Sequence, residues 1–424
     1  MVKRFIEYIV FIGFLYLFLF NPPYSIFRGL FGVGNFIVLA SIVFAIAKPR
    51  HIRSFISHFK KEYSLLVILF IYVLFRTIVG GERTYLTRHF LGICNFFLVI
   101  PMILYYAKSI GLKSEEQIIK SVLVVGTVAA FVSIICLVTP SLNEYVRNNL
   151  LRLEADDYLA LNTYRGFGYA NMLTSDYGFV LGLIAGYGSM YLKDNKFFYF
   201  CIPLLLFAAI INARTGALLA IIIISLSVFV KKRLGYGLAI IAPAVLLVSY
   251  YDVLFDLIGV DARTVEFSLS LFKEAQDVIQ GNVEGSYAAN ELFNNMIVFP
   301  PSILEWVVGR GYSIVKGGSA GYSDVGWILQ LNYGGLIYIT ILYLFFLTMI
   351  RRLRIHKKRT CMWTMIMYIL LINTKSSIFP GYSSFYLLFM FYAIKLLPEY
   401  NGIIKQEDKT IDFRNHARES LVMQ

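Results

Sequence analysis

The sequence predicts an all-α fold, specifically a polytopic membrane protein with about twelve transmembrane helices. The chain has 424 residues, of which 58% are hydrophobic and only 15% are charged. Its mean hydropathy is +0.67. Such a composition leaves too little polar surface for a soluble globule. About twelve stretches approach the roughly 20 apolar residues that a membrane-spanning helix needs.

Basic residues fall in every second connector, and this pattern predicts the topology because positive charge marks the cytoplasmic side. The first apolar run is followed by Asn21-Pro22-Pro23 rather than by a cleavage site, so we expect the first helix to be retained. Both termini are then cytoplasmic, including a tail at 399–424. The predicted spans are 5–20, 27–47, 64–80, 90–106, 117–138, 177–192, 197–212, 216–230, 235–255, 327–350, 362–374 and 383–397.

Two outer connectors are much longer than the rest, at 139–176 and 257–326. Long loops on a rigid scaffold often carry function. The second loop contains amphipathic stretches at 265–278 and 290–299, which predict short helices at the membrane surface. We therefore expect a single polytopic domain over 1–424 with two large outer loops.

The net charge of +13 follows this topology, so we expect no nucleic-acid partner. The four cysteines show no CxxC spacing and lie in or beside apolar spans, and the chain has no carboxylate cage. We predict neither a metal site nor a cofactor. Membrane lipid is the one partner that composition alone indicates.

On the predicted outer side arginine outnumbers lysine about three to one, whereas lysine is the commoner of the two on the inner side. A guanidinium group is permanently charged and binds phosphate through two parallel hydrogen bonds. The distribution therefore suggests that a pyrophosphate is handled at the outer face. Four local clusters contain the arginines of interest.

The first two clusters precede or interrupt apolar runs. Tyr164-Arg165-Gly166-Phe167-Gly168-Tyr169-Ala170-Asn171 combines a phosphate-binding fork with aromatics that can stack on sugars, although an ordinary glycine-rich turn remains an alternative. Asn212-Ala213-Arg214-Thr215-Gly216 interrupts the apolar run 197–230, so we expect the chain to turn there. Arg214 faces an anionic headgroup or simply snorkels to the interface.

The third cluster is Gly309-Arg310-Gly311-Tyr312, followed by Tyr322-Ser323-Asp324-Val325-Gly326 and Asn332-Tyr333-Gly334-Gly335. Asp324 can act as a base or merely cap the following helix. The fourth cluster contains Arg76, Arg83 and Arg88. We interpret Arg83 as a helix anchor and give Arg76 and Arg88 a role in the site.

The order of these features resembles the bacterial Wzy oligosaccharide repeat-unit polymerases, which are related to O-antigen ligases. The residues that carry the resemblance are Arg165 with its Gly-Phe-Gly context, the 212–216 hairpin, and Val308-Gly309-Arg310-Gly311-Tyr312 leading to Asp324. The similarity covers the layout of 90–350 but few residues. Related ligases carry a His near the position of Asp324, and this chain does not.

The resemblance implies a metal-independent glycosyltransferase in the bacterial inner membrane with a periplasmic active site. Its partners would be an undecaprenyl-pyrophosphate-linked glycan donor, a lipid-linked acceptor and a chain-length regulator. The expected catalytic residues are Arg165, Arg214, Arg310 and Asp324, and the expected substrate-binding residues are Arg76, Arg88, Tyr164, Asn171, Tyr312 and Tyr322. A lipid-linked oligosaccharide flippase and an O-antigen ligase are the alternative functions.

Overall fold

A computed structural model describes residues 2–22, 33–112, 114–151, 166–170, 176–190, 196–231, 296–312, 323, 325–374 and 383–396. All regular structure within these ranges is helical and they contain no strand, which confirms the predicted all-α class. The predicted span at 235–255, the amphipathic stretch at 265–278 and the tail at 399–424 lie outside the described residues.

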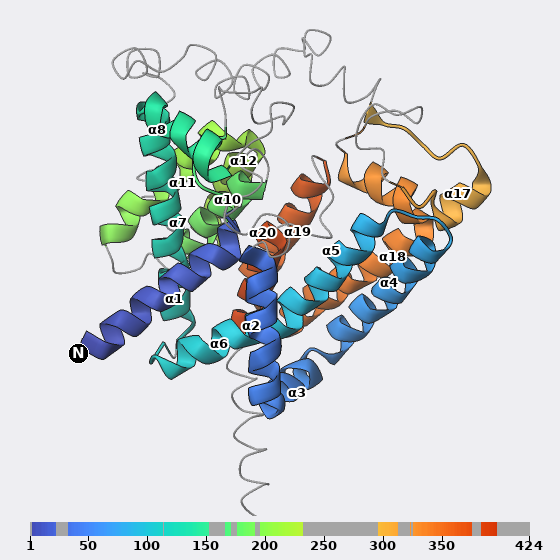
Figure 1. The fold of residues 1–424 in the computed structure, drawn as a ribbon, viewed down its shortest axis with the longest axis horizontal. Coiled ribbons are helices and arrows are strands. Elements are labelled where there is room, and N and C mark those ends of the chain that lie inside the picture. Colours follow the sequence, from blue (N-terminus) through green and yellow to red (C-terminus); the bar gives the residue numbers. More distant parts are fainter. Residues whose placement is uncertain are drawn as a thin grey trace, which may run out of the picture.

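Figure 1 shows two groups of helices with α19 and α20 between them. In the first group, α4 (Lys60–Ile78) packs against α5 (Arg83–Cys94) and α18 (Gly326–Ile355), and α18 also carries the short α17 (Ile303–Val308). The second group consists of α7 (Glu115–Val138), α10 (Asp176–Ser189), α11 (Lys196–Asn212) and α12 (Arg214–Lys231). The groups are joined by α19 (Arg359–Asn373), which contacts α12 and α18, while α1 (Val2–Phe20) and α20 (Ser383–Lys395) pack against each other.

The remaining helices show how proline and local capping shape the chain. The short α3 (Pro49–His58) is bent by 102° from α2 (Val33–Ala47) and starts at a proline. From α5 the chain continues through the π-helical η2 (Asn95–Val99) into α6 (Ile100–Ser109), where Pro101 has no N–H for the helical ladder. Ser114 and Gln117 form a capping box at the start of α7.

Within the ranges that the structure describes, three helical segments are long and apolar enough to cross a membrane, at Arg83–Ser109, Glu115–Val138 and Gly326–Ile355. The bent pair α2 and α3 adds a fourth if it forms one span. Large hydrophobic side chains also lie exposed on the helix surfaces, as lipid contact requires; they include Phe5, Ile9, Phe36, Ile71 and Leu347. The structure thus has the character of a membrane protein, and the count of twelve spans stays a prediction.

Several predicted boundaries change in the structure. Because α5 already begins at Arg83, Arg88 lies on a helix and not in a connector. The first long loop opens with two further helical segments, α8 (Pro140–Tyr145) and η3 (Val146–Leu151). The predicted turn in the apolar run 197–230 is confirmed, since the helix breaks at Ala213 between α11 and α12. The N-cap of α18 is Val325, which makes no side-chain capping bond.

Glycines bring α10 and α12 into backbone contact. Gly178, Gly182 and Gly186 recur every fourth residue along α10 and so lie on one face. A Cβ on Gly182 would overlap the carbonyl oxygen of Gly216, and a Cβ on Gly216 would overlap the backbone of Gly178. Small residues at this spacing are typical of membrane helix pairs, whose association depends on close packing.

Candidate functional site

The third predicted cluster forms a compact centre around a break in α18. Gly335 has a non-helical backbone conformation, with φ 63° and ψ −166°, and separates the first part of this helix from the remainder. Gly309, which ends α17, also has a positive φ of 73°. A Cβ on either glycine would overlap backbone atoms of the other segment, so both positions require glycine.

The Gly309-Arg310-Gly311 segment packs against the break and pairs with its backbone. The amide of Arg310 donates to the carbonyl of Asn332 at 2.6 Å, and the amide of Gly311 donates to that of Tyr333 at 2.9 Å. From α4, the hydroxyl of Tyr72 lies 2.8 Å from the carbonyl oxygen of Gly334. Irregular backbone in a membrane protein must find such partners within the protein.

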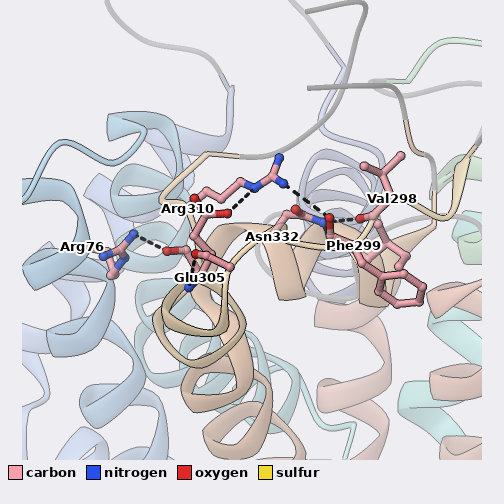
Figure 2. A network of polar contacts seen from close by, with 9 residues as sticks. Arg76, Val298, Phe299, Glu305, Arg310 and Asn332 are labelled. Carbon is pink, nitrogen blue, oxygen red and sulfur yellow. Dashed lines mark hydrogen bonds and ion pairs between the residues drawn. The ribbon is translucent and has the colours of Figure 1, made fainter. Parts of the chain in front are cut away.

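Two nitrogen atoms of the Arg310 guanidinium group hold this side chain in the centre (Figure 2). Its Nε donates to Glu305 Oε2 at 3.0 Å, and its Nη2 lies 3.4 Å from the carbonyl oxygen of Phe299. The Arg310 side chain is only 9% exposed. Nη1 has no protein acceptor among the described residues. The guanidinium group of Arg310 is thus held in one orientation and still has N–H donors for an anionic ligand.

Arg76, which the sequence analysis assigned to a separate cluster, contacts the same centre and has a structural role there. Its Nη2 donates to the carbonyl of Gly309 at 2.8 Å and so fixes the loop that carries Arg310. Its Nε is buried and has no acceptor among the described residues. Nearby, Glu82 donates its amide to the carbonyl of Gly311 at 2.8 Å. Tyr312 follows this loop and is 43% exposed, so it is available to a ligand.

The burial pattern of α18 relates this centre to the membrane. The part before the break is buried almost throughout, whereas Leu336 and Ile337, directly after it, are exposed. After the break, the uncharged part of α18 runs from Leu336 to Ile350, and Arg351, Arg352 and Arg354 follow it. The break at Gly335 thus lies in the first third of the candidate span Gly326–Ile355, and these arginines lie at its other end.

The first and second predicted clusters meet in a separate centre in the other helix group. The amide of Phe167 donates to Asn212 Oδ1 at 2.6 Å, and Ser133 Oγ on α7 donates to the carbonyl of Phe167 at 2.9 Å. The Tyr177 hydroxyl lies 2.8 Å from Ser133 Oγ. Phe167 is only 5% exposed. Of the aromatic rings in this motif, that of Phe167 is thus in the core and does not face a ligand, while Tyr164, the predicted substrate-binding residue, lies outside the described residues.

The structure describes neighbours of the two arginines in these clusters but not their side chains. Arg214 begins α12, two residues after Asn212, and its side chain lies outside the described residues. The same holds for all of Tyr164, Arg165, Asn171, Tyr322 and Asp324. What the structure does establish is that the segment directly after Arg165 and the one directly before Arg214 are bonded to each other.

Arg88 lies apart from both centres. It lines a hollow of about 200 Å³ that also contacts Asn35, Asn95 and Tyr386. Its helix is nevertheless tied to the broken α18, because the rings of Tyr85 and Tyr333 stack at 3.7 Å. Of the predicted substrate-binding residues that the structure describes, Arg76 and Tyr312 belong to the Gly309–Tyr312 loop region, whereas Arg88 lines this hollow.

Sequence reasoning missed two buried carboxylates. Asp176 accepts hydrogen bonds from the amides of Ser383 at 2.5 Å and Ser384 at 2.9 Å, and so ties α10 to the start of α20. Glu62 on α4 is 1% exposed and accepts a hydrogen bond from Tyr392. For Asp176, the sequence offered one indication, the Ser383-Ser384 pair at the start of an apolar helix. Serine and aspartate both favour helix starts.

The arrangement can bind an anion at Arg310 beside a broken helix. In the part of the chain that the structure describes, no group of three His, Cys, Asp or Glu side chains is placed to hold a metal ion. The chain matches no family model and no curated protein sequence. The function therefore has to be proposed from the residues and their geometry.

Proposed function

We propose that the protein polymerises undecaprenyl-pyrophosphate-linked oligosaccharide repeat units, as a Wzy-type glycosyltransferase at the periplasmic face of a bacterial inner membrane. The observation that carries the proposal is Arg310, which Glu305 orients and whose Nη1 has no acceptor among the described residues. We place this side chain at the outer boundary of the apolar layer, where a lipid-linked pyrophosphate must lie because its polyprenyl chain stays in the bilayer.

In the proposed reaction, a hydroxyl group on the acceptor's terminal sugar attacks the anomeric carbon of the donor glycan. A new glycosidic C–O bond forms, the C–O bond to the pyrophosphate breaks, and undecaprenyl pyrophosphate leaves. The hydroxyl proton passes to a base, for which Asp324 is the candidate. Negative charge grows on the leaving pyrophosphate, so Arg310, Arg214 and Arg165 would stabilise the transition state more than the ground state.

The position of the helix break argues against the transporter alternative. Transporters with broken helices place the break and the binding site near the middle of the bilayer. In α18 the break at Gly335 lies in the first third of the candidate span, and the uncharged stretch 336–350 after it measures roughly 22 Å, most of the hydrocarbon core. A site at the membrane boundary suits transfer between two lipid-linked sugars better than passage through the bilayer.

A strain lacking the gene distinguishes these functions. We expect its surface to carry glycans one repeat unit long, because translocation continues while polymerisation stops. Separation of the surface glycans by size is the measurement, with the complemented strain as control. Repeat units that accumulate on the cytoplasmic face would instead indicate a flippase, and full-length polymer that stays lipid-linked would indicate a ligase.

A further inference from the structure

A second basic site lies at the opposite end of α18 from Arg310. A hollow of about 430 Å³ opens where α3 passes into α4 and the last turns of α18 pack against them. This volume falls in the range of small-ligand sites. The hollow is lined by Ser57, His58, Lys60, Lys61, Glu62, Thr348, Arg351, Arg352 and Ile355. It lies on the predicted cytoplasmic side.

Glu62 and Arg352, which both line the hollow, form an ion pair. Arg352 Nη1 lies 3.5 Å from Glu62 Oε1, and the same carboxylate accepts from the Tyr392 hydroxyl. Arg352 also contacts His58, with its Nη1 2.8 Å from the His58 carbonyl oxygen and its Nη2 2.6 Å from Nε2. Burial and the neighbouring Arg352 lower the pKa of His58 to about 4. The neutral imidazole therefore accepts a hydrogen bond from Arg352 and leaves the cationic character of the hollow unchanged.

The other three cations of the hollow have no counter-charge. Lys60, Lys61 and Arg351 are exposed, and within the described ranges none of them forms an ion pair. Since Glu62 is already engaged with Arg352 and Tyr392, the hollow presents a net positive charge to its opening. The alternative is that these lysines reflect only the excess of positive charge in cytoplasmic connectors. That alternative explains neither the hollow nor the buried carboxylate of Glu62.

Exposed apolar side chains continue from the hollow along α18. Ile355, which lines the hollow, is 64% exposed, and Leu347 and Leu344, which precede Arg351 by four and seven residues, are 57% and 46% exposed. An occupant can therefore place phosphate among the cations while its hydrocarbon lies along these side chains. Basic pockets between helices on the cytoplasmic side are known to accept anionic headgroups.

We propose that this hollow binds the headgroup phosphate of an anionic phospholipid of the cytoplasmic leaflet. Lys60, Lys61 and Arg351 contact the phosphate, and Glu62 positions Arg352 behind them. The site is independent of the glycan chemistry proposed for the outer face. It would hold the ends of α3, α4 and α18 together from the cytoplasmic side.

The test is a titration of phosphatidylglycerol against the full-length protein in phosphatidylcholine nanodiscs, followed by native mass spectrometry of retained lipid. The variant is Lys61→Gln with Arg351→Gln. Its matched control is Arg354→Gln with Lys357→Gln, which removes the same charge from exposed positions on the same side that do not line the hollow. At roughly fivefold in affinity per basic residue, the variant should bind about thirtyfold more weakly, while the control should stay within about twofold of the wild type.

Several outcomes would overturn the proposal. Equal weakening in variant and control would mean that only total charge matters, and unchanged binding in both would mean that the lipid sits elsewhere. Displacement of phosphatidylglycerol by millimolar inorganic phosphate would indicate a site for a soluble anion. If the double variant fails to fold, as judged by size-exclusion chromatography, the single variant Lys61→Gln, whose side chain is exposed, is compared with Arg354→Gln and should bind about fivefold more weakly.

Discussion

Replacing Gly182 by Ala should destabilise the protein by roughly 3 kcal/mol, the upper range for an overpacked core. The added Cβ would overlap the carbonyl oxygen of Gly216, and a backbone atom in a packed helix cannot rotate away as a side chain can. The two helices would have to separate and lose the close contact that holds them. The measurement is the free energy of unfolding in mixed micelles containing increasing amounts of denaturing detergent.

Gly13→Ala is the matched control, because it makes the same chemical change on another apolar helix. A Cβ at Gly13 would meet no atom within 4 Å. Alanine is also the better helix former by up to about 1 kcal/mol, so this variant should be as stable as the wild type or more stable. Equal stability of Gly182→Ala and Gly13→Ala would show that α10 and α12 are not packed as described.

Replacing Arg310 by Ala should lower polymer formation by about 100-fold or more, the usual loss when one donor to a developing charge is removed. Arg310→Lys should recover only part of the activity, because an ammonium group cannot form two parallel bonds to phosphate. We expect Arg214→Ala to have a similar effect. Polymer length in the complemented deletion strain measures both, with Arg83→Ala as the control.

Arg310 also pairs with Glu305, so a structural role must be separated from a role in the reaction. Removing Arg310 leaves the Glu305 carboxylate, which is partly exposed, without its ion pair. The double variant Arg310→Ala with Glu305→Gln removes that carboxylate as well. If it regained polymer formation, Arg310 would be merely the partner of Glu305; we expect it to stay as inactive as Arg310→Ala.

Hydrophobic patterning predicted the helices well because a membrane helix needs only length and apolarity. The breaks were predicted less completely. The turn at Ala213 was evident because the run 197–230 is too long for one helix, whereas the break at Gly335 gave no comparable signal. It arises from tertiary contact, since the conformation of Gly335 depends on the Gly309 segment that packs against it.

The sequence indicated individual residues of the candidate site but not which of them lie together. Arg76 and Arg310 were singled out separately, and the structure brings them to one loop through the Gly309 carbonyl. The pairing of Arg310 with Glu305 was not predicted, because a Glu five residues earlier is not on the same face of a regular helix. Phe167 looked like a sugar-stacking ring and is buried, because burial depends on packing that sequence spacing does not encode.

The most direct test of the central claim is a transfer assay with the purified protein. Lipid-linked repeat units from the deletion strain are incubated with wild-type protein in liposomes that contain EDTA, and the products are separated by size. We expect a ladder of longer glycans, release of undecaprenyl pyrophosphate in proportion to the bonds formed, and no ladder with Arg310→Ala. Unchanged repeat units with folded wild-type protein would contradict it.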